Sequence, residues 1–239
     1  MAVSLSVVVP VKDEAENVQP LAREIAAVVA PDTCEIIFVD DGSRDDTAAR
    51  LQALKSELSN LRVLQHAQNA GQSRAIRTGI RGARGDIIVT LDGDGQNDPA
   101  DIPKLVDRLC QGTDRVGLVS GVRAKRQDKF SRRLASRLAN AIRGSLLKDG
   151  AADTGCGLKA FRREAFLALP YFDNVHRYLI ALMIREGYEV RFIEVGHRPR
   201  LRGASKYTNL NRMAVSIADL FGVRWLQRRY KPSIETREI

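Results

Sequence analysis

The sequence predicts one α/β domain with a mainly parallel sheet and helices on both of its faces. Short apolar runs alternate with segments of helical apolar spacing, four times within about the first ninety residues. Such alternation requires crossover helices between neighbouring strands, which makes the strands parallel and buries both faces of the sheet. The 239 residues suit a single domain, and no linker, repeat or low-complexity tract divides them.

The first half of the chain contains four expected strands with helices between them. The run SLSVVV, residues 4–9, is apolar and is closed by Pro10, so we expect a buried strand that ends there. The helix after the second strand is expected to start at a cap on Asp45 or Asp46 and to reach about Leu58. The other expected elements are a helix over 14–30, strands over 35–39, 61–65 and 86–91, and a helix over 71–83.

After Asp114 the elements follow one another less regularly. The patterns predict a strand over 115–123, a basic amphipathic helix over 129–147, a strand and helix over 158–169, a helix over 177–187, a strand over 188–195 and a final helix over 210–227. We therefore expect one continuous domain whose two halves differ in character.

The net charge of +9 is concentrated in the second half of the chain. From Arg123 onward the runs RAKRQDKFSRRLASR, HRPRLRGASKY and RWLQRRYK are strongly basic. Such runs suit phosphate, nucleic acid or an anionic membrane surface, although each alone could be a solvated helix face. Aromatic residues make up only 5% of the chain and do not interleave with the basic runs, so nucleic acid is not an expected partner.

The cysteines and the apolar content predict a cytosolic protein. Cys34, Cys110 and Cys156 are widely spaced and form no CxxC pair, so we expect reduced thiols rather than disulfides or a zinc site. No stretch approaches the roughly 20 apolar residues that span a bilayer. The first residues also lack the charged start and cleavage site of a signal peptide.

Polar segments follow each of the first four expected strands: PVKDEAEN, DDGSRDD, NAGQS and DGDGQND. Ligands of open parallel sheets bind beyond the carboxyl ends of the strands, so we expect the site at this acidic edge. The first turn holds Asp13 and Glu14 where a dinucleotide-binding domain needs glycines, which argues against that class. A pyrophosphate bound here would need a divalent cation beside it.

The segment DGDGQND, which follows the fourth strand, has four possible interpretations. A calcium loop starting at Asp92 fails, because its sixth position is Asn97 and its twelfth is Pro103. A catalytic carboxylate pair and a simple polar turn both stay possible. A metal-nucleotide site fits better, since Asp92 and Asp94 lie two residues apart and point to the same side of an extended chain. Nearby glycines allow a close approach, and Gln96 adds an amide oxygen suited to Mg²⁺ or Mn²⁺.

Five segments together resemble a known family: VVVPVKDEAENV, IIFVDDGSRDDT, NAGQSRAIRTGIRGARGDIIVTLDGDGQNDP, DTGCGLKAFRRE and HRPRLRGASKY. They extend from residue 6 to about 207, in the order found in the family-2 glycosyltransferases of the GT-A fold. More narrowly, the chain resembles the polyprenyl-phosphate sugar synthases related to dolichol-phosphate mannose synthase. The resemblance implies a Rossmann-like GT-A domain. Residues 1–114 would bind the nucleotide sugar, residues 115–210 the acceptor, and residues 211–239 would form a basic amphipathic helix and tail.

The resemblance also implies roles for individual residues. Asp92 matches the aspartate placed near the donor, and Asp94 and Gln96 match the metal-binding pair, so that Asp92, Asp94 and the acceptor-side Asp153 are the catalytic candidates. The residues matched to the nucleotide-sugar pocket are Pro10, Val11, Lys12, Glu14, Asp41, Asp92, Gly93 and Asp94. Those matched to acceptor or phosphate binding are Arg123, Arg132, Ser136, Arg202, Ser205 and Lys206.

Two departures from the family pattern affect these expectations. The usual motif reads DADLQDPPE, whereas this chain has DGDGQNDPAD, which loosens the loop and puts Asp98 and Asp101 in doubt as ligands. Many relatives also carry C-terminal transmembrane helices, and this sequence stops at Ile239 without one.

The implied reaction moves a sugar from a nucleoside diphosphate sugar to a polyprenyl phosphate. A phosphate acceptor is already an anion near neutral pH, so no strong general base is needed and direct displacement with inversion is expected. A hydroxyl acceptor, as in polysaccharide or protein glycosylation, would need a base, and Asp153 is the candidate. A polyanion-binding protein without enzymatic activity is the weaker alternative.

Three histidines and the last helix have less specific expectations. His66 is expected to be a satisfied polar residue, His176 a helix cap, and His197 a possible phosphate contact. The last helix combines an apolar face with the run RRYK, so it could lie on an anionic membrane, pack on the sheet or bind a separate membrane protein. We expect peripheral contact with the cytoplasmic face of a membrane.

Overall fold

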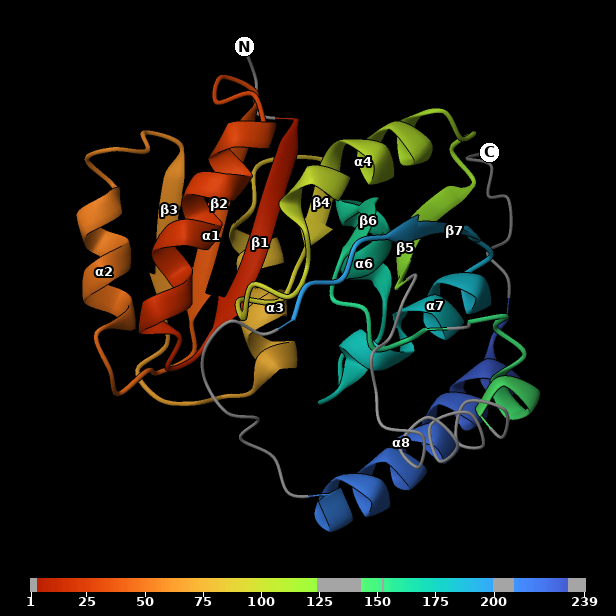
Figure 1. Ribbon diagram of the computed structural model, residues 1–239. Coiled ribbons are helices and arrows are strands. Elements are labelled where there is room, and N and C mark those ends of the chain that lie inside the picture. The colour runs from red at the N-terminus through yellow and green to blue at the C-terminus, as the bar shows by residue number, and fades with distance from the viewer. Residues whose placement is uncertain (1–3, 124–142, 152, 200–208, 232–239) are drawn as a thin grey trace, which may run out of the picture.

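The computed structural model describes residues 4–123, 143–151, 153–199 and 209–231, with residues 209–214 described as helix backbone only. Within these ranges a seven-stranded sheet forms the centre of the molecule (Figure 1). The strands lie side by side in the order β3-β2-β1-β4-β6-β5-β7. Their bounds are β1 Leu5–Val11, β2 Cys34–Asp40, β3 Leu61–Gln65, β4 Ile87–Thr90, β5 Val116–Arg123, β6 Lys159–Arg162 and β7 Glu189–Val195.

One strand of the sheet runs against the others. The pairs β3–β2, β2–β1, β1–β4 and β5–β7 are parallel, whereas β6 is antiparallel to both β4 and β5. The mainly parallel sheet expected from the sequence is thus confirmed. Because β6 is reversed, its first residue lies at the edge where the parallel strands end.

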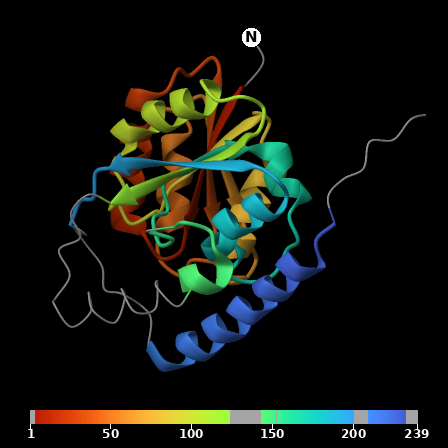
Figure 2. The same ribbon diagram turned by 90° about the vertical axis from the view of Figure 1, so that its right-hand side faces the viewer.

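Helices cover both faces of the sheet, as predicted. Helices α1, α2 and α4 pack on one face and α3, α6 and α7 on the other, while α8 lies beside α7 and away from the sheet (Figures 1 and 2). Their bounds are α1 Ala15–Val28, α2 Thr47–Leu54, α3 Gln72–Gly82, α4 Ile102–Cys110, α6 Arg163–Ala168, α7 Val175–Arg185 and α8 Asn209–Arg229, with a 3₁₀ turn η1 at Pro99–Asp101.

The central strands are apolar on both sides because each side meets a helix layer. In β1, Val7 and Val9 belong to the core under α1 and α4, whereas Val8 belongs to the core under α3 and α7. All three side chains are fully buried. Parallel strands covered on both faces therefore appear in the sequence as continuous apolar runs rather than alternating ones.

Two boundaries differ from the sequence-based expectation. Strand β1 does not stop at Pro10 but continues to Val11, because its pairing with β2 extends that far while its pairing with β4 ends at Val8. Proline lacks an N–H group, which is tolerated where the neighbouring strand has ended. Helix α2 ends at Leu54 rather than near Leu58.

The start of α2 distinguishes the two cap candidates. The side chain of Asp46, the residue before the helix, makes no capping hydrogen bond. The Asp45 carboxylate instead accepts hydrogen bonds from the backbone N–H of Thr47, at 3.0 Å, and from its hydroxyl. Asp45 therefore satisfies a donor that the helix leaves without a partner.

In the second half the expected strands and helices are present within the described residues. The basic helix predicted over 129–147 lies largely outside them, and its last part, 143–147, is helical. The final predicted helix corresponds to α8. Among the described residues, no helix combines the length and the apolar content needed to cross a bilayer.

Candidate active site

A cavity of about 900 Å³ lies at the carboxyl edge of the sheet and is lined by both halves of the chain. Its volume is within the range typical of small-molecule sites. Ten of the site residues predicted from the sequence line this cavity: Pro10, Val11, Lys12, Glu14, Asp41, Asp92, Gly93, Asp94, Arg123 and Asp153. The structure thus brings together side chains that the sequence separates by up to about 140 residues.

The remaining predicted site residues are not among those lining the cavity. Gln96 is described but does not line it. Arg132 and Ser136 fall in 124–142, and Arg202, Ser205 and Lys206 fall in 200–208, all outside the described residues.

The loop after β1 is hydrogen-bonded to the loop after β2. The Lys12 ammonium donates to the Gly42 carbonyl at 3.0 Å, and the Glu14 backbone N–H donates to the Thr47 hydroxyl at 2.8 Å. The Glu14 carboxylate accepts a hydrogen bond from the Asn17 amide at 2.6 Å. These contacts give the two loops one shape where they form a wall of the cavity.

Asp41 organises the loop after β3. Its buried carboxylate accepts hydrogen bonds from the backbone N–H groups of Ala70 and Gly71, both at 2.8 Å, and contacts His66 Nδ1 at 2.7 Å. The other ring nitrogen of His66 contacts the Thr78 hydroxyl at 2.9 Å. His66 is thus hydrogen-bonded through both nitrogens, as expected of a satisfied polar residue, and Asp41 fixes the backbone next to the cavity.

Asp92 lies just beyond β4, between α3 and the loop that precedes β6. Gln72 donates to Asp92 Oδ1 at 2.9 Å, and a methyl group placed on Gly157 would collide with the Asp92 carboxylate. Burial and the neighbouring charge of Asp94 raise the pKa of Asp92 to about 6, against the opposing charges of Lys159 and Arg123. Since burial and a like charge both disfavour the ionised Asp92 carboxylate, a cation bound nearby would stabilise it.

Asp94 follows Asp92 by two residues and is the expected carboxylate ligand of a metal ion. It lines the cavity, and its Oδ1 accepts a hydrogen bond from the Gln96 backbone N–H at 3.1 Å. The described residues contain no group of three or more His, Cys, Asp or Glu side chains arranged around one point. Mg²⁺ and Mn²⁺ at nucleotide sites commonly take one or two carboxylates and complete their shell with phosphate oxygens and water. Asp94 and Asp92 both line the cavity and together supply the one or two carboxylates that such a shared site needs.

Arg123 and Asp153 form a bidentate ion pair on the other side of the cavity. Arg123 Nε donates to Asp153 Oδ2 and Nη2 donates to Oδ1, both at 2.7 Å. Both side chains are largely buried, and the Asp153 carboxylate raises the pKa of Arg123. Asp153 also accepts a hydrogen bond from the Gly155 N–H at 3.2 Å. Both oxygens of the candidate base are therefore engaged by donors.

Lys159 is a site residue that sequence reasoning missed. It is the first residue of β6, is 5% exposed, lines the cavity and donates its ammonium to the Cys156 carbonyl. Burial lowers its pKa, and electrostatic interactions with Cys156, Asp92 and Asp153 oppose that shift. The signal was present in the segment GLKAF, because a lysine inside a buried apolar strand needs a partner or a function.

Asp98 and Asp101 have structural partners. Asp98 Oδ1 accepts hydrogen bonds from the Ala100 N–H at 3.0 Å and from Arg198 at 2.7 Å. Asp101 accepts from Lys104 at 2.6 Å and from the Gly196 N–H at 2.7 Å. These partners are consistent with the doubt raised about the two carboxylates as metal ligands. Both carboxylates hold the segment after β7 in place, and His197 of that segment forms a β-bridge with Asn97.

The start of α7 forms the remaining wall of the cavity, with His176 and Arg177 among its lining residues. The Ser73 hydroxyl and His176 Nδ1 lie 2.7 Å apart, which joins α3 to α7. The expectation that His176 caps a helix is wrong, because α7 begins at Val175 and Asn174 is the residue before it.

Comparison with known sequences finds relatives whose names describe polyprenyl-phosphate sugar synthases or transferases. It is 35% identical over 234 residues to a dodecaprenyl-phosphate galacturonate synthase of Rhizobium johnstonii, covering 95% of this chain and 68% of the relative. It is 40% identical over 210 residues to an undecaprenyl-phosphate 4-deoxy-4-formamido-L-arabinose transferase of Pseudomonas aeruginosa, covering 85% of this chain and 60% of the relative. The chain thus spans about three fifths to two thirds of these relatives' length.

Comparison with solved structures supports the fold. The glucosyl-3-phosphoglycerate synthase of Mycobacterium tuberculosis in complex with UDP superposes with a TM-score of 0.71 at 21% identity, covering 96% of this chain and 82% of that one. A complex of the same enzyme with Mn²⁺, UDP and glucosyl-3-phosphoglycerate gives a TM-score of 0.69, with 96% and 81% covered, again at 21% identity. The expected GT-A fold is confirmed.

The family description Glycosyl transferase family 2 matches residues 6–169, which include the loops after β1, β2 and β4 and the start of β6. With the relatives above, this shows that the chain belongs to glycosyl transferase family 2.

Proposed function

We propose that the chain is an inverting, metal-dependent glycosyltransferase that moves a sugar from a nucleoside diphosphate sugar to a polyprenyl phosphate. The observation that carries the choice of acceptor is the bidentate pair between Arg123 and Asp153. A hydroxyl acceptor needs a base, and Asp153 was the candidate, yet both of its oxygens accept hydrogen bonds from a guanidinium. A phosphate acceptor needs no base. The names of the relatives in Rhizobium and Pseudomonas support the same acceptor class.

The donor is assigned to the side of the cavity formed by the loops after β1, β2 and β4. Val11 and Pro10 offer an apolar surface next to Lys12 and Glu14, which suits a nucleoside. Asp41 shapes the neighbouring loop through backbone N–H groups, so it acts on the nucleotide pocket through that loop. The diphosphate would then lie towards Asp92 and Asp94.

Asp94 would hold a divalent cation, with Asp92 next to it. A bound Mg²⁺ or Mn²⁺ supplies positive charge against the diphosphate leaving group. Solved relatives of this fold contain Mn²⁺ together with UDP, which supports a metal of this class. Gln96, which does not line the cavity, is the less favoured member of the expected metal pair.

The chain's own residues orient the two substrates. Gln72 and Gly157 fix the Asp92 carboxylate, and Asp92 faces the region in which the donor sugar would lie. Arg123 neutralises Asp153, so an acceptor phosphate that approaches from this side meets a neutral pair and the buried amino group of Lys159. Attack by a phosphate oxygen on the face opposite the leaving diphosphate breaks one bond as it forms the other, and this inverts the anomeric carbon.

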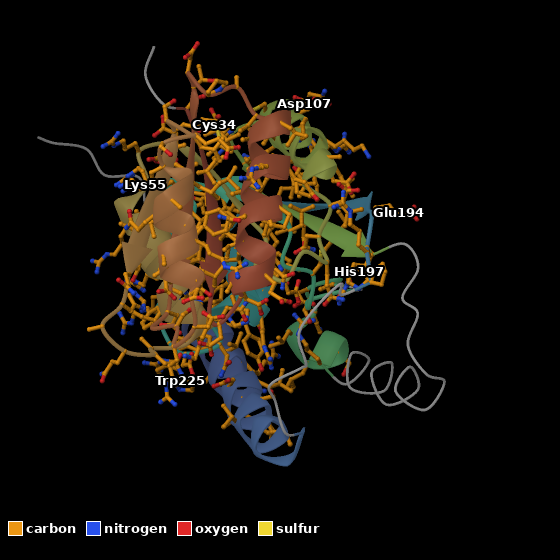
Figure 3. The ribbon with its side chains drawn as sticks, turned by 60° about the vertical axis from the view of Figure 1, so that its left-hand side comes forward. Cys34, Lys55, Asp107, Glu194, His197 and Trp225 are labelled. Atoms are coloured by element: carbon orange, nitrogen blue, oxygen red, sulfur yellow. The ribbon has the colours of Figure 1, made fainter. Side chains whose placement is uncertain are left out.

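Helix α8 gives the chain a surface suited to a lipid substrate. Its large exposed apolar side chains are Val215, Ile217, Phe221 and Trp225, and its inner side packs on α7 through Val223 and neighbours. Figure 3 shows Trp225 at the periphery of the molecule. Arg228 and Arg229 close the helix. Aromatic and apolar residues flanked by arginines are typical of helices that lie in a membrane interface, so we place the enzyme at the surface of a membrane, on its cytoplasmic face.

The test measures transfer directly. Purified protein is incubated with Mn²⁺ or Mg²⁺, a panel of nucleotide sugars and a short-chain polyprenyl phosphate, and the glycolipid is detected by mass spectrometry. Asp94→Asn should lower the rate roughly 100-fold or more, because it removes the charge that would hold the metal. Asp98→Asn is the matched control, since this carboxylate lies in the same loop but pairs with Arg198 outside the cavity.

Each outcome decides one part of the proposal. Product from the wild type and Asp98→Asn, but not from Asp94→Asn, supports both the reaction and the metal site. Transfer only to hydroxyl acceptors would overturn the acceptor assignment. Equal loss in both variants would overturn the special role of Asp94.

A further inference from the structure

Helix α3 carries an arginine pair that the proposed reaction does not use. Arg74 and Arg77 lie one turn apart on the side opposite the buried residues of the helix, and α3 contains no acidic residue. Neither arginine lines the cavity, although Gln72 and Ala75 beside them do. The charges therefore lie just outside the cavity and are not balanced along their own helix.

Both guanidinium groups stack on one aromatic ring. The Cζ atoms of Arg74 and Arg77 lie 4.3 and 4.5 Å from the centroid of the Tyr171 ring. Among the described residues, neither guanidinium forms a hydrogen bond or an ion pair. Stacking holds a guanidinium by its face and leaves its N–H edge available, which is the edge that binds phosphate oxygens. Two like charges held this close favour an anion between or beside them.

The arginine pair is connected to the cavity and to α8. Tyr171 belongs to the loop before α7, and Asp173 of that loop lines the cavity, with its Oδ1 bonded to the Asn174 N–H at 2.9 Å. The next residue, Phe172, packs on Tyr178 with ring centroids 6.1 Å apart, and the Tyr178 hydroxyl donates to the Ser216 carbonyl of α8 at 2.8 Å. Figure 1 shows the start of α3 and helix α8 on the same side of the sheet, where the parallel strands end.

We propose that Arg74 and Arg77, stacked on Tyr171, form a docking site for the phosphate groups of anionic membrane lipids. The inference rests on the proposed function, which brings this side of the molecule to a membrane. Among the described residues these two charges have no acidic partner, so they are complementary to an anionic headgroup, and α8 supplies the apolar contact that two arginines lack. The chain would then touch the membrane on two sides of the cavity, at α8 and at the arginine pair.

The test is binding to lipid vesicles, measured by co-sedimentation without donor or acceptor. One set of vesicles contains phosphatidylcholine alone, and the other also contains phosphatidylglycerol. The double variant Arg74→Gln/Arg77→Gln should bind the anionic vesicles about tenfold or more weakly than the wild type, since each basic residue at such a surface contributes about a factor of five. Added salt should reduce the difference.

The matched control is Arg81→Gln/Arg84→Gln, which removes the same charge. Arg81 lies at the far end of α3 and Arg84 just beyond it, both are exposed, and neither stacks on Tyr171. We expect less than about a threefold loss for this control. A third variant, Tyr171→Leu, keeps every charge and should give an intermediate loss, because the arginines are no longer held in place.

The outcomes separate this inference from the proposed reaction. Equal losses in the two double variants would show that only net charge matters and would overturn the arginine site, as would unchanged binding of Arg74→Gln/Arg77→Gln. Either result can occur whether or not sugar transfer is detected, because the vesicle measurement contains no substrate. Circular dichroism spectra that match the wild type establish that each variant is folded.

Discussion

On the side of the cavity proposed for the donor, Asp41 is held by two backbone N–H groups and by His66, whereas on the side proposed for the acceptor, Asp153 is held by the guanidinium of Arg123. Asp40, next to Asp41, follows the donor-side pattern and is bonded to Ser43 and Gln65. Neutral donors leave the negative charge of a carboxylate in place, but a guanidinium cancels it. This difference supports the proposal that the donor side attracts a cation and that the acceptor side admits an anion.

The largest effect is expected when the acceptor-side pair is broken. Arg123→Met leaves Asp153 buried without its cation, so the free energy of unfolding should fall by about 3–5 kcal/mol. Urea unfolding measures this. The double variant Arg123→Met/Asp153→Leu should recover much of the loss, because a buried ion pair is often replaceable by apolar residues. If the double variant is no more stable than the single one, the pair is not the source of the loss.

A smaller loss is expected on the donor side. Asp41→Asn turns one oxygen into an amide group that faces a backbone N–H, which should cost about 1–3 kcal/mol in urea unfolding. The KM for the nucleotide sugar should also rise, since the loop bonded to Asp41 lines the cavity. Asp46→Asn is the control, because Asp46 is exposed and makes no capping bond. A loss as large as that of Arg123→Met would remove the contrast between the two sides.

Glu35 in β2 accepts hydrogen bonds both from neutral donors and from a guanidinium. The pH dependence of the free energy of unfolding therefore sharpens the comparison. Burial alone would raise its pKa, but hydrogen bonds from Ser6, the Arg84 N–H and Arg62 hold the pKa below its usual value. A lowered folded-state pKa stabilises the protein above the unfolded-state pKa of about 4.3, and this contribution disappears as the pH falls through the folded-state value.

Glu35→Gln should therefore cost about 1–2 kcal/mol near pH 7, and the difference from the wild type should shrink below about pH 4. Urea unfolding at a series of pH values measures both. A difference that stays constant with pH would mean that the Glu35 carboxylate contributes by shape rather than by charge.

The smallest effect is expected at Gly95, in the loop that carries Asp94. Its φ of +74° is in the left-handed region, and a methyl group there would meet no neighbouring atom within 4 Å. Gly95→Ala should cost about 1 kcal/mol in urea unfolding, from backbone strain alone. A much larger loss would show that the donor-side loop depends on backbone geometry as well as on neutral hydrogen bonds.

The residues that follow each parallel strand were predictable because strand ends meet at one edge of such a sheet. This rule places Pro10, Asp41 and Asp92 in the same cavity from the sequence alone. The partnership of Arg123 with Asp153 was not predictable, since the two are thirty positions apart and meet only because β6 lies beside β5. Lys159 was missed for a related reason. Because β6 is antiparallel to β4, the first residue of β6, rather than its last, lies at the edge of the sheet that carries the site.

The insertion of β6 also has a consequence for the order in which the protein can fold. Its β4 and β5 neighbours both precede it in the chain, so the sheet stays divided into β3-β2-β1-β4 and the later strands until β6 has been synthesised. Pairing β4 with β6 joins Thr90 to Lys159 and closes a long loop, which is slow compared with forming adjacent βαβ units. Until then β4 exposes an unpaired edge to other chains. The strand that completes the cavity is thus also the one that covers the open edge of β4.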